Sequence, residues 1–371
     1  MKPPFPNAAA KGPAFDFNDR PFVIIWEITR ACALACRHCR AEAEARAHSL
    51  QLNTEEGFRL IDQVKRANPA LFIMTGGDPV MRRDLPQLAR YATDQGLHVS
   101  LSPSATPRLV NSDFHELKRE GIQRISLSID GPTREEHDAF RGVPGTWDWT
   151  MRAIEKAREA DLPFQINTTI TRGNIGRFDA FRELLVKLKP ALWSVFLVVP
   201  TGRATAADMP DPDELEDFLV GLYHYSLEAQ FDVKTTEGPF YRRIQLQRGT
   251  TNQNRYGRQV PLGINDGKGF VFISHTGEIN PSGFLPFHAG NVRRDELIDV
   301  YRTHPTFRHL RDAAALRGKC GQCEFNTICG GSRARAYAMT GNPLGEDPLC
   351  VYQPVRMTRA GVSENAGFAL A

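Results

Sequence analysis

Short apolar runs recur along the first half of the chain, and segments with helical spacing separate them. The runs are nearly continuous in hydrophobic residues, which is typical of strands that are covered on both faces. They lie at residues 22–28, 71–74, 98–102, 124–129, 164–170 and 194–199. The pattern therefore predicts six strands in this part of the chain.

The segments between these runs carry apolar residues at helical spacing. One of them follows Asn53, a residue type that caps helices, and places Phe58, Ile61 and Val64 on one face. Another such segment covers residues 210–229. Alternating strands and helices predict an α/β fold with parallel strands and right-handed crossovers. Periodicity alone allows a TIM-type barrel or an open doubly wound sheet.

The pattern changes after residue 230. Residues 231–266 are mixed polar and basic, and we expect a linking region with a solvated face, although it could also line a substrate channel. Residues 269–280 then predict a β-hairpin, with a turn at Thr276 and Gly277. The sequence therefore predicts five parts: a flexible arm (1–21), a first domain (22–230), the linker (231–266), a second domain (267–355) and a tail (356–371).

Composition and charge exclude several classes of function. The chain has 371 residues and a net charge of +3 from 46 basic and 43 acidic residues, a balance that does not indicate nucleic-acid or membrane binding. No apolar run approaches the roughly 20 residues of a membrane span. The first residues also lack the apolar core of a signal peptide.

The seven cysteines fall in two groups. We call Cys32, Cys36 and Cys39 the first cysteine cluster, and Cys320, Cys323, Cys329 and Cys350 the second cysteine cluster. An odd count argues against a fully paired disulfide framework. Thiolates that are kept reduced for metal binding imply a cytoplasmic protein.

The first cysteine cluster has the spacing C-x3-C-x2-C and follows the first apolar run. Three thiolates this close together can ligate three irons of a [4Fe–4S] cluster, which leaves one iron open to a small molecule. Zinc sites more often show paired C-x2-C or Cys/His spacing with four ligands. Three inert buried thiols are a further alternative.

With this array the chain resembles the radical SAM superfamily. The resemblance implies a partial (β/α)6 TIM-type barrel in which the first cysteine cluster is catalytic. Its [4Fe–4S] cluster binds S-adenosylmethionine (SAM) and cleaves it reductively to a 5′-deoxyadenosyl radical. The residue before the third cysteine is often aromatic in the family and is His38 here.

Residues at the carboxyl ends of barrel strands build active sites, and several of them resemble SAM-binding motifs here. Residues 76–79 read Gly-Gly-Asp-Pro and resemble the GGEP motif of the family. Asp130 lies two residues after Ser128 on the same face, which suits ribose hydroxyls. In relatives the residue at Arg141 pairs with the SAM carboxylate, although a surface or capping role is the alternative. The predicted SAM contacts are Gly76, Gly77, Asp78, Pro79, Ser104, Ser128, Asp130, Arg141 and Asn167.

The second cysteine cluster has loop spacing, C-x2-C-x5-C-x20-C. Four cysteines can hold zinc or a cubane cluster, and the spacing does not separate the two. Together with the hairpin they resemble the SPASM/twitch extension of radical SAM enzymes. That resemblance implies one auxiliary [4Fe–4S] cluster with four cysteine ligands, which passes an electron. Ser282 and Ser332 stand where the related haem-pathway enzymes tend to have cysteine.

Further segments resemble the radical SAM enzymes of alternative haem and haem d1 biosynthesis. They lie at residues 36–43, 137–145, 165–172, 199–204 and 329–350. The resemblance implies oxidative decarboxylation of tetrapyrrole propionates, for which Arg203, Arg242 and Lys268 are candidate cationic partners. It also implies an external electron donor, such as flavodoxin or ferredoxin, and neither nucleic-acid nor membrane partners.

Two other interpretations are open. A SPASM-type maturase would modify a ribosomal peptide or a small molecule, but the 21 residues before the first strand are too few for the usual peptide-recognition domain. A non-catalytic iron–sulfur electron-transfer protein would not need the motifs at the strand ends. His275 and His288 could bind a haem iron, but a lone histidine is more often structural, and neither is named as a ligand.

Overall fold

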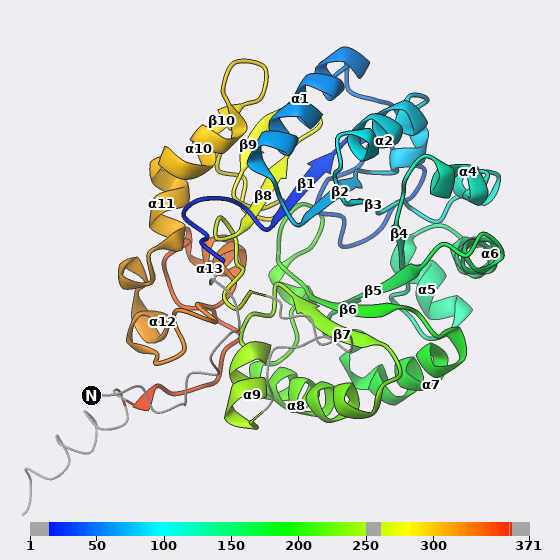
Figure 1. Cartoon of the computed structure of the whole chain (residues 1–371). Coiled ribbons are helices and arrows are strands. Elements are labelled where there is room, and N and C mark those ends of the chain that lie inside the picture. The colour runs from blue at the N-terminus through cyan, green and yellow to red at the C-terminus, as the bar shows by residue number, and fades with distance from the viewer. Residues whose placement is uncertain (1–14, 250–260, 356, 358–371) are drawn as a thin grey trace, which may run out of the picture.

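The computed structural model describes residues 15–249, 261–355 and 357. Its strands form one continuous sheet (Figure 1). Its strand order is β10-β9-β8-β1-β2-β3-β4-β5-β6-β7. The first seven strands are β1 (Val23–Glu27), β2 (Leu71–Thr75), β3 (Val99–Leu101), β4 (Arg124–Ser128), β5 (Phe164–Ile170), β6 (Leu192–Leu197) and β7 (Asp232–Thr236).

Strands β1 to β7 run parallel and lie in sequence order. A doubly wound sheet would reverse its order at a switch point. The order therefore confirms the barrel-type prediction and excludes the doubly wound alternative. The barrel is partial, because β7 and β10 are the two edges of the sheet among the described strands.

Helices surround this sheet on its outer side (Figure 1). They are α1 (Thr54–Ala67), α2 (Leu85–Asp94), α3 (Pro107–Val110), α4 (Phe114–Arg119), α5 (Arg134–Arg141), α6 (Thr146–Glu159), α7 (Phe178–Leu188) and α8 (Pro212–Glu228). Short 3₁₀ helices cover Pro79–Met81, Ile175–Arg177, Ala206–Asp208 and Ala313–Ala315.

Helix α1 shows how the sequence forms these elements. Asn53 accepts a hydrogen bond from the backbone N–H of Glu56, and the Glu56 carboxylate accepts one from the N–H of Asn53, both at 2.9 Å. This capping box satisfies two otherwise unpaired donors at the start of the helix. Leu60, Ile61 and Val64 are then buried on the face toward the sheet.

Residues 231–266 differ from the predicted linker. Strand β7 pairs with β6 and extends the barrel beyond the six predicted strands, and α9 (Tyr241–Gln247) follows it. The expected solvated face is wrong for Tyr241 and Arg243, which are buried. Arg243 forms an ion pair with Glu216 at 2.5 Å. The hydrophobic pattern did not predict β7, because its sequence is polar and an edge strand need not be apolar on both faces. Residues 250–260 of the predicted linker lie outside the described residues.

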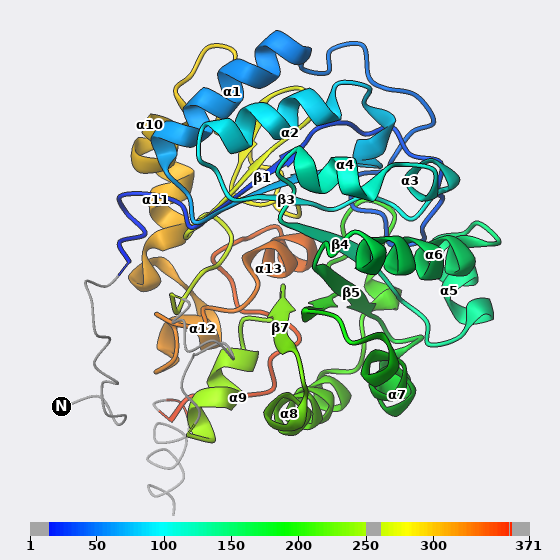
Figure 2. The same cartoon turned by 45° about the vertical axis from the view of Figure 1, so that its right-hand side comes forward.

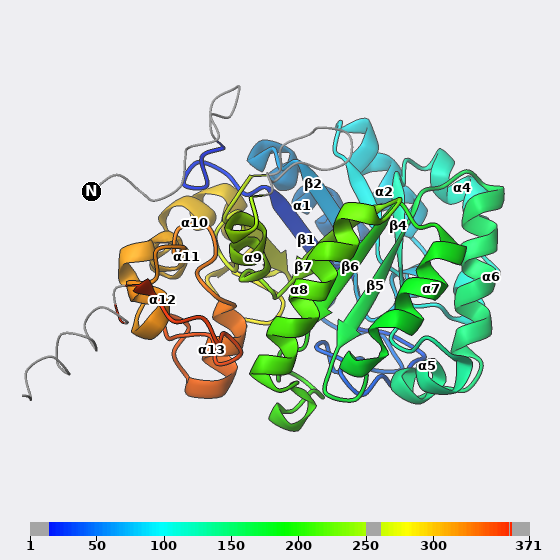
Figure 3. The ribbon, with the colours of Figure 1, turned by 90° about the horizontal axis from the view of Figure 1, so that it is seen from below.

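The predicted hairpin consists of β8 (Phe270–Ile273) and β9 (Glu278–Asn280), followed by β10 (Gly290–Asn291). Strand β8 also pairs in parallel with β1, so the hairpin continues the barrel sheet. The remaining helices are α10 (Leu297–Thr303), α11 (Pro305–Arg311), α12 (Gly318–Gln322) and α13 (Arg333–Thr340). They gather on the side opposite α4, α6 and α7 (Figure 3). The boundary of a second domain at residue 267 stays a prediction.

Helix α13 lies between the edge strand β7 and the hairpin (Figure 2). Ala334 of α13 packs with Val199, which follows β6, and with Leu285, which follows the hairpin. The C-terminal segment thus contacts both sides of the open barrel.

Residues 15–21, the described part of the predicted flexible arm, contact the C-terminal helices. Tyr301 donates a hydrogen bond to the Phe17 carbonyl at 2.5 Å, and Arg302 pairs with Asp19 at 2.6 Å. Residues 1–14 lie outside the described residues, as does the predicted tail except Met357. No helix in the described part of the chain is long and apolar enough to cross a membrane.

Candidate active site

The first cysteine cluster lies in the loop after β1, and each of its sulfurs has a hydrogen-bond donor. The Leu34 N–H donates to Cys32 at 3.4 Å, and the Ala43 N–H donates to Cys39 at 3.5 Å. The guanidinium of Arg141 lies 3.7 Å from the sulfur of Cys36. Donors of this kind orient and stabilise metal-bound thiolates. The three side chains therefore fit a [4Fe–4S] cluster.

Arg203 adds a second positive charge beside the first cysteine cluster. Burial alone would raise the pKa of Cys39, but the N–H of Ala43 and the Arg203 guanidinium lower it overall. Burial would lower the pKa of Arg203, but a hydrogen bond to Cys39 and the charges of the three cysteines raise it overall. Its Nε and Nη2 atoms are buried and have no hydrogen-bond partner among the described residues. Arg203 therefore has free donors beside the cluster.

Gly76 and Gly77 bring the chain after β2 against the backbone that precedes Cys32. A Cβ on Gly76 would lie 2.5 Å from the Thr29 carbonyl oxygen, and one on Gly77 would lie 2.4 Å from that of Arg30. The Gly77 N–H donates to the Thr29 carbonyl at 2.8 Å. The glycines thus serve close backbone packing here, and their contact with SAM stays a prediction.

Asp78 links three strand ends beneath the same loop. It is fully buried and accepts hydrogen bonds from the Thr106 hydroxyl at 2.8 Å and the Ser104 N–H at 3.3 Å. Burial raises the pKa of Asp78 to about 6. The Ser104 hydroxyl lies 3.4 Å from the Cys32 sulfur. Sequence reasoning missed Thr106, which the structure joins to Asp78, Ser104 and the cluster.

Pro79 starts the 3₁₀ turn after Asp78 and is buried. It therefore sets the direction of the chain after the glycine pair. Its predicted contact with SAM stays a prediction.

Asp130 and Arg141 form an ion pair with each other, which the sequence did not predict. Burial would raise the pKa of Asp130, but the Arg141 charge and neighbouring groups lower it. Asp130 also accepts a hydrogen bond from the Thr169 N–H at 2.7 Å. This carboxylate holds Arg141 against Cys36. The predicted roles toward the ribose and carboxylate of SAM stay predictions.

Ser128 and Asn167 are register partners across β4 and β5 and are half-buried. The Asn167 side chain accepts a hydrogen bond from Gln165 at 2.6 Å.

His38, the residue before the third cysteine, packs its ring 4.5 Å from that of Phe140, and its Nδ1 atom has no partner among the described residues. Burial lowers the pKa of His38 to about 4.

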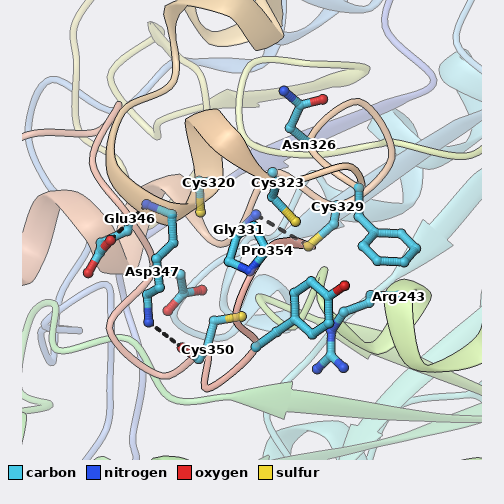
Figure 4. A pocket seen from close by; sticks show the side chains of 14 residues that line it. Arg243, Cys320, Cys323, Asn326, Cys329, Gly331, Glu346, Asp347, Cys350 and Pro354 are labelled. Carbon is cyan, nitrogen blue, oxygen red and sulfur yellow. Dashed lines mark hydrogen bonds between the residues drawn. The ribbon is translucent and has the colours of Figure 1, made fainter. Parts of the chain in front are cut away.

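The second cysteine cluster surrounds a small pocket. Figure 4 shows the four sulfurs pointing toward the same space, which has an empty volume of about 410 Å³ and is partly open to solvent. The Gly331 N–H donates to Cys329 at 3.5 Å, and Arg333 donates to Cys320 at 3.6 Å. In the described part of the chain, no group of three or more His, Cys, Asp or Glu side chains is placed to hold a single metal ion.

Two thiols of this cluster, those of Cys329 and Cys350, have strongly raised pKa values. Burial raises the pKa of Cys329 to about 12 and that of Cys350 to about 11. Such thiols keep their protons at neutral pH unless metal binding displaces them. Four cysteines around one pocket fit either a [4Fe–4S] cluster or zinc.

Arg335 and Asp347 form a completely buried ion pair at 3.0 Å close to this pocket. Asp347 lines the pocket and accepts a hydrogen bond from the Ser332 N–H at 2.8 Å. The pair therefore holds both ends of the loop that carries Cys329 and Cys350.

The two serines at cysteine-like positions bond to buried carboxyl groups. Ser332 donates to Glu237 at 2.5 Å, and Ser282 hydrogen-bonds to Asp266. Burial raises the pKa of Glu237 and of Asp266, which lie close enough to interact. The sequence contained no signal for these carboxyl groups, because each lies outside any recognisable motif.

Glu27 connects the first cysteine loop with the hairpin. It pairs with Arg40 at 2.7 Å and with His275 at 2.9 Å. His275 is therefore already engaged through Nδ1, and His288 is exposed, 3.8 Å from Glu278.

Two of the three candidate partners of a substrate carboxylate are occupied. Arg242 donates to the carbonyls of Ile264 and Ile328, and Lys268 donates to that of Thr327 at 2.7 Å. These bonds position the segment around the second cysteine cluster. Arg203, by contrast, has two buried donors, Nε and Nη2, without a partner in the described part of the chain.

Comparisons with known proteins agree with this geometry. The family model of the radical SAM superfamily matches residues 26–185. The AdoMet-dependent heme synthase of Oleidesulfovibrio alaskensis is 42% identical over 340 residues, which cover 90% of this chain and 87% of that protein. The enzyme of the same name from Methanosarcina barkeri is 39% identical and covers 91% and 98%.

A similar fold occurs among solved structures. The crystal structure of Streptococcus suis SuiB bound to S-adenosylmethionine has a TM-score of 0.69 and 16% identity, and the match covers 90% of this chain and 78% of that one. At this level of identity the likeness shows the fold.

Proposed function

This chain belongs to the radical SAM superfamily, and from that premise we propose that it removes carbon dioxide oxidatively from propionate side chains of a haem precursor, such as iron-coproporphyrin III. The observation that carries the proposal is the 42% identity, over nine-tenths of the chain, to a relative named AdoMet-dependent heme synthase. The proposed substrate is a tetrapyrrole with free carboxylates.

The first cysteine cluster would hold a [4Fe–4S] cluster through Cys32, Cys36 and Cys39. When bound and reduced there, this group and SAM supply a 5′-deoxyadenosyl radical. Arg141 stabilises the Cys36 thiolate, and Asp130 keeps Arg141 in place. Of the remaining predicted SAM contacts, Gly76 to Pro79 follow β2, Ser104 follows β3, Ser128 ends β4 and Asn167 lies within β5.

The proposed reaction converts a propionate side chain into a vinyl group. A propionate loses one hydrogen atom to the deoxyadenosyl radical, then carbon dioxide and one electron, and a vinyl group is left. The reacting carboxylate needs a cationic partner until it leaves, and a guanidinium fork suits a carboxylate. The free Nε and Nη2 atoms of Arg203, beside Cys39, support that role.

The second cysteine cluster would hold a [4Fe–4S] cluster with no open iron, and the chemistry of such a group is one-electron transfer. The four thiols line one shared space, as the ligands of a single cluster would. A flavodoxin or ferredoxin is the expected external donor, and thiols that stay reduced for metal binding support a cytoplasmic location.

Anaerobic turnover tests the proposal. The reconstituted protein is incubated with SAM, a reductant and iron-coproporphyrin III, and the products are read by mass spectrometry. We expect porphyrins lighter by the loss of hydrogen and carbon dioxide, together with 5′-deoxyadenosine. Deoxyadenosine without a changed porphyrin would contradict the proposal. It would then favour peptides, such as the precursor peptide SuiA in a SuiB complex that is 17% identical, or small molecules.

A further inference from the structure

Cations approach the second cysteine cluster from more than one segment of the chain. Arg333 donates to the Cys320 sulfur at 3.6 Å, and Lys319 donates to the Cys350 carbonyl at 2.8 Å. Arg243 of α9 is a further cation, and it lines the pocket that the four sulfurs surround (Figure 4). A metal cluster with four thiolate ligands carries negative charge, which cations beside it offset.

The guanidinium of Arg243 is held firmly at the wall of this pocket. The residue is buried, with 4% of its surface exposed. Its Nη2 donates to both carboxylate oxygens of Glu216, at 2.5 and 2.7 Å, and its Nη1 donates to Gln247 at 2.9 Å. The ring of Tyr352, which also lines the pocket, has its centre 4.9 Å from the guanidinium carbon, within the range of a cation–π interaction.

One donor of this guanidinium is left over. The Nε atom of Arg243 is buried and has no hydrogen-bond partner among the described residues. A buried donor without a partner is costly, and almost every buried donor in native proteins has one. Because Arg243 lines the pocket, a group held there by the four cysteines is placed to accept this hydrogen bond.

The carboxylates near the pocket do not cancel this charge. Asp347 pairs with Arg335 at 3.0 Å, and the exposed Glu346 accepts a hydrogen bond from the backbone N–H of Lys319 at 2.8 Å. Glu216 pairs with Arg243 itself, but Arg243 lines the pocket and Glu216 does not. The positive end of this ion pair is therefore the end that faces the second cysteine cluster.

We propose, on the basis of the proposed function, that Arg243 donates its free Nε–H to the auxiliary [4Fe–4S] cluster and raises the reduction potential of that cluster. Net charge and hydrogen bonds to sulfur both set such potentials, and each favours the reduced, more negative state here. Arg243 thereby makes the second site a better acceptor for the one electron that leaves the substrate with carbon dioxide. Glu216 acts through Arg243, because it positions the guanidinium and offsets part of its charge.

Redox titration of the reconstituted protein tests this assignment. Every measurement uses a Cys36→Ala background, since two remaining thiols should not hold the first cluster and the signal then comes from the second. The reduction potential is followed by electron paramagnetic resonance. Arg243→Gln should shift the reduction equilibrium by about tenfold toward the oxidised state, since a charged hydrogen bond is lost. For a one-electron couple this lowers the potential by about 59 mV.

Three companion variants separate the effect of charge from that of structure. Glu216→Gln removes the negative partner and should raise the potential, opposite to the effect of Arg243→Gln. Arg243→Lys keeps the charge and should restore most of the potential. Arg248→Gln removes an exposed charge at the end of the same helix and should change nothing. A merely structural role of the ion pair would not move its two partners in opposite directions.

Iron and sulfide content per chain checks that each variant still holds its cluster. An Arg243→Gln variant that keeps the cluster and has the potential of its background overturns the inference. If Arg243→Gln does not assemble the cluster, Glu216→Gln decides, and a potential that is unchanged or lower in that variant overturns the inference.

The outcomes also separate this inference from the proposed function. Zinc in place of iron in the Cys36→Ala protein contradicts the proposed auxiliary cluster and, with it, this assignment. A wild-type protein that converts the porphyrin, beside Arg243 and Glu216 variants with unchanged potentials, overturns the inference alone. Potentials that shift as expected, in a protein that does not convert the porphyrin, support the inference and contradict the proposed substrate.

Discussion

The first cysteine cluster takes three thiols from one loop of eight residues, 32–39, whereas the second gathers four thiols from residues 320–350. Around the first, Arg141 and Arg203 approach from distant parts of the barrel. Around the second, Gly331 and Arg333 come from the loop and helix that follow Cys329.

The difference concerns what each site leaves open. With three thiols, an iron–sulfur cluster keeps one iron for another ligand, and Arg203 keeps free donors beside it. With four thiols, the proposed auxiliary cluster would have no open iron, and the buried Arg335–Asp347 pair lies close to it. A site that performs chemistry needs an open position, whereas a site that only moves electrons is better closed.

Cys36→Ala should have the largest effect. It removes one of only three thiols, so we expect complete loss of SAM cleavage and of about half of the bound iron. Deoxyadenosine is measured by chromatography after anaerobic reduction. Reductive cleavage that persists in this variant would rule out the first cysteine cluster as the SAM site.

Cys329→Ala is the matched change in the second cluster. It should also lose about half of the iron, but reductive cleavage of SAM should continue, because the open site is intact. The decarboxylated porphyrin should be absent, since the electron has no acceptor. If Cys329→Ala abolishes SAM cleavage as completely as Cys36→Ala, the two clusters do not have separate roles.

Arg335→Ala tests whether the second site depends on its buried ion pair. Removing one partner leaves Asp347 as an uncompensated buried charge, and we expect a loss of about 3–5 kcal/mol in the free energy of unfolding. Denaturant titration measures it, with the exposed Arg83→Ala as control. A loss no larger than that of the control would show that the pair is dispensable.

Glu56→Gln should have the smallest effect. Glu56 of α1 pairs with Arg293, after β10, at 2.7 Å, and this pair joins the barrel to the C-terminal segment. Arg293 lowers the pKa of Glu56 to about 2 from 4.5. The stabilisation is therefore present above about pH 4.5 and is lost as the pH falls toward 2.

For a pair near the surface we expect at most about 1 kcal/mol. Unfolding of the wild type and of Glu56→Gln is compared near neutral pH and at about pH 3. The exposed neighbour Glu55→Gln is the control. A difference between wild type and variant that does not shrink in acid would contradict the assigned ion pair.

Much of this architecture could be read from local pattern. Nearly continuous apolar runs predicted strands β1 to β6, because a strand buried on both faces needs apolar residues at every position. Strand β7 was missed for the opposite reason: it lies at the edge of the sheet, its side chains are half-buried or exposed, and its sequence is polar. The cysteine spacing predicted both ligand sets, since ligands of one site on one loop are close along the chain.

The sequence by itself determined the alternation of strands and helices, the hairpin and the identity of the thiols, because these depend on neighbours along the chain. Only the tertiary structure decided that Asp130 pairs with Arg141 and that Ser332 donates a hydrogen bond to Glu237. Such contacts depend on strand register and on how distant segments pack. No local pattern encodes them, because each partner lies far from the other in the sequence.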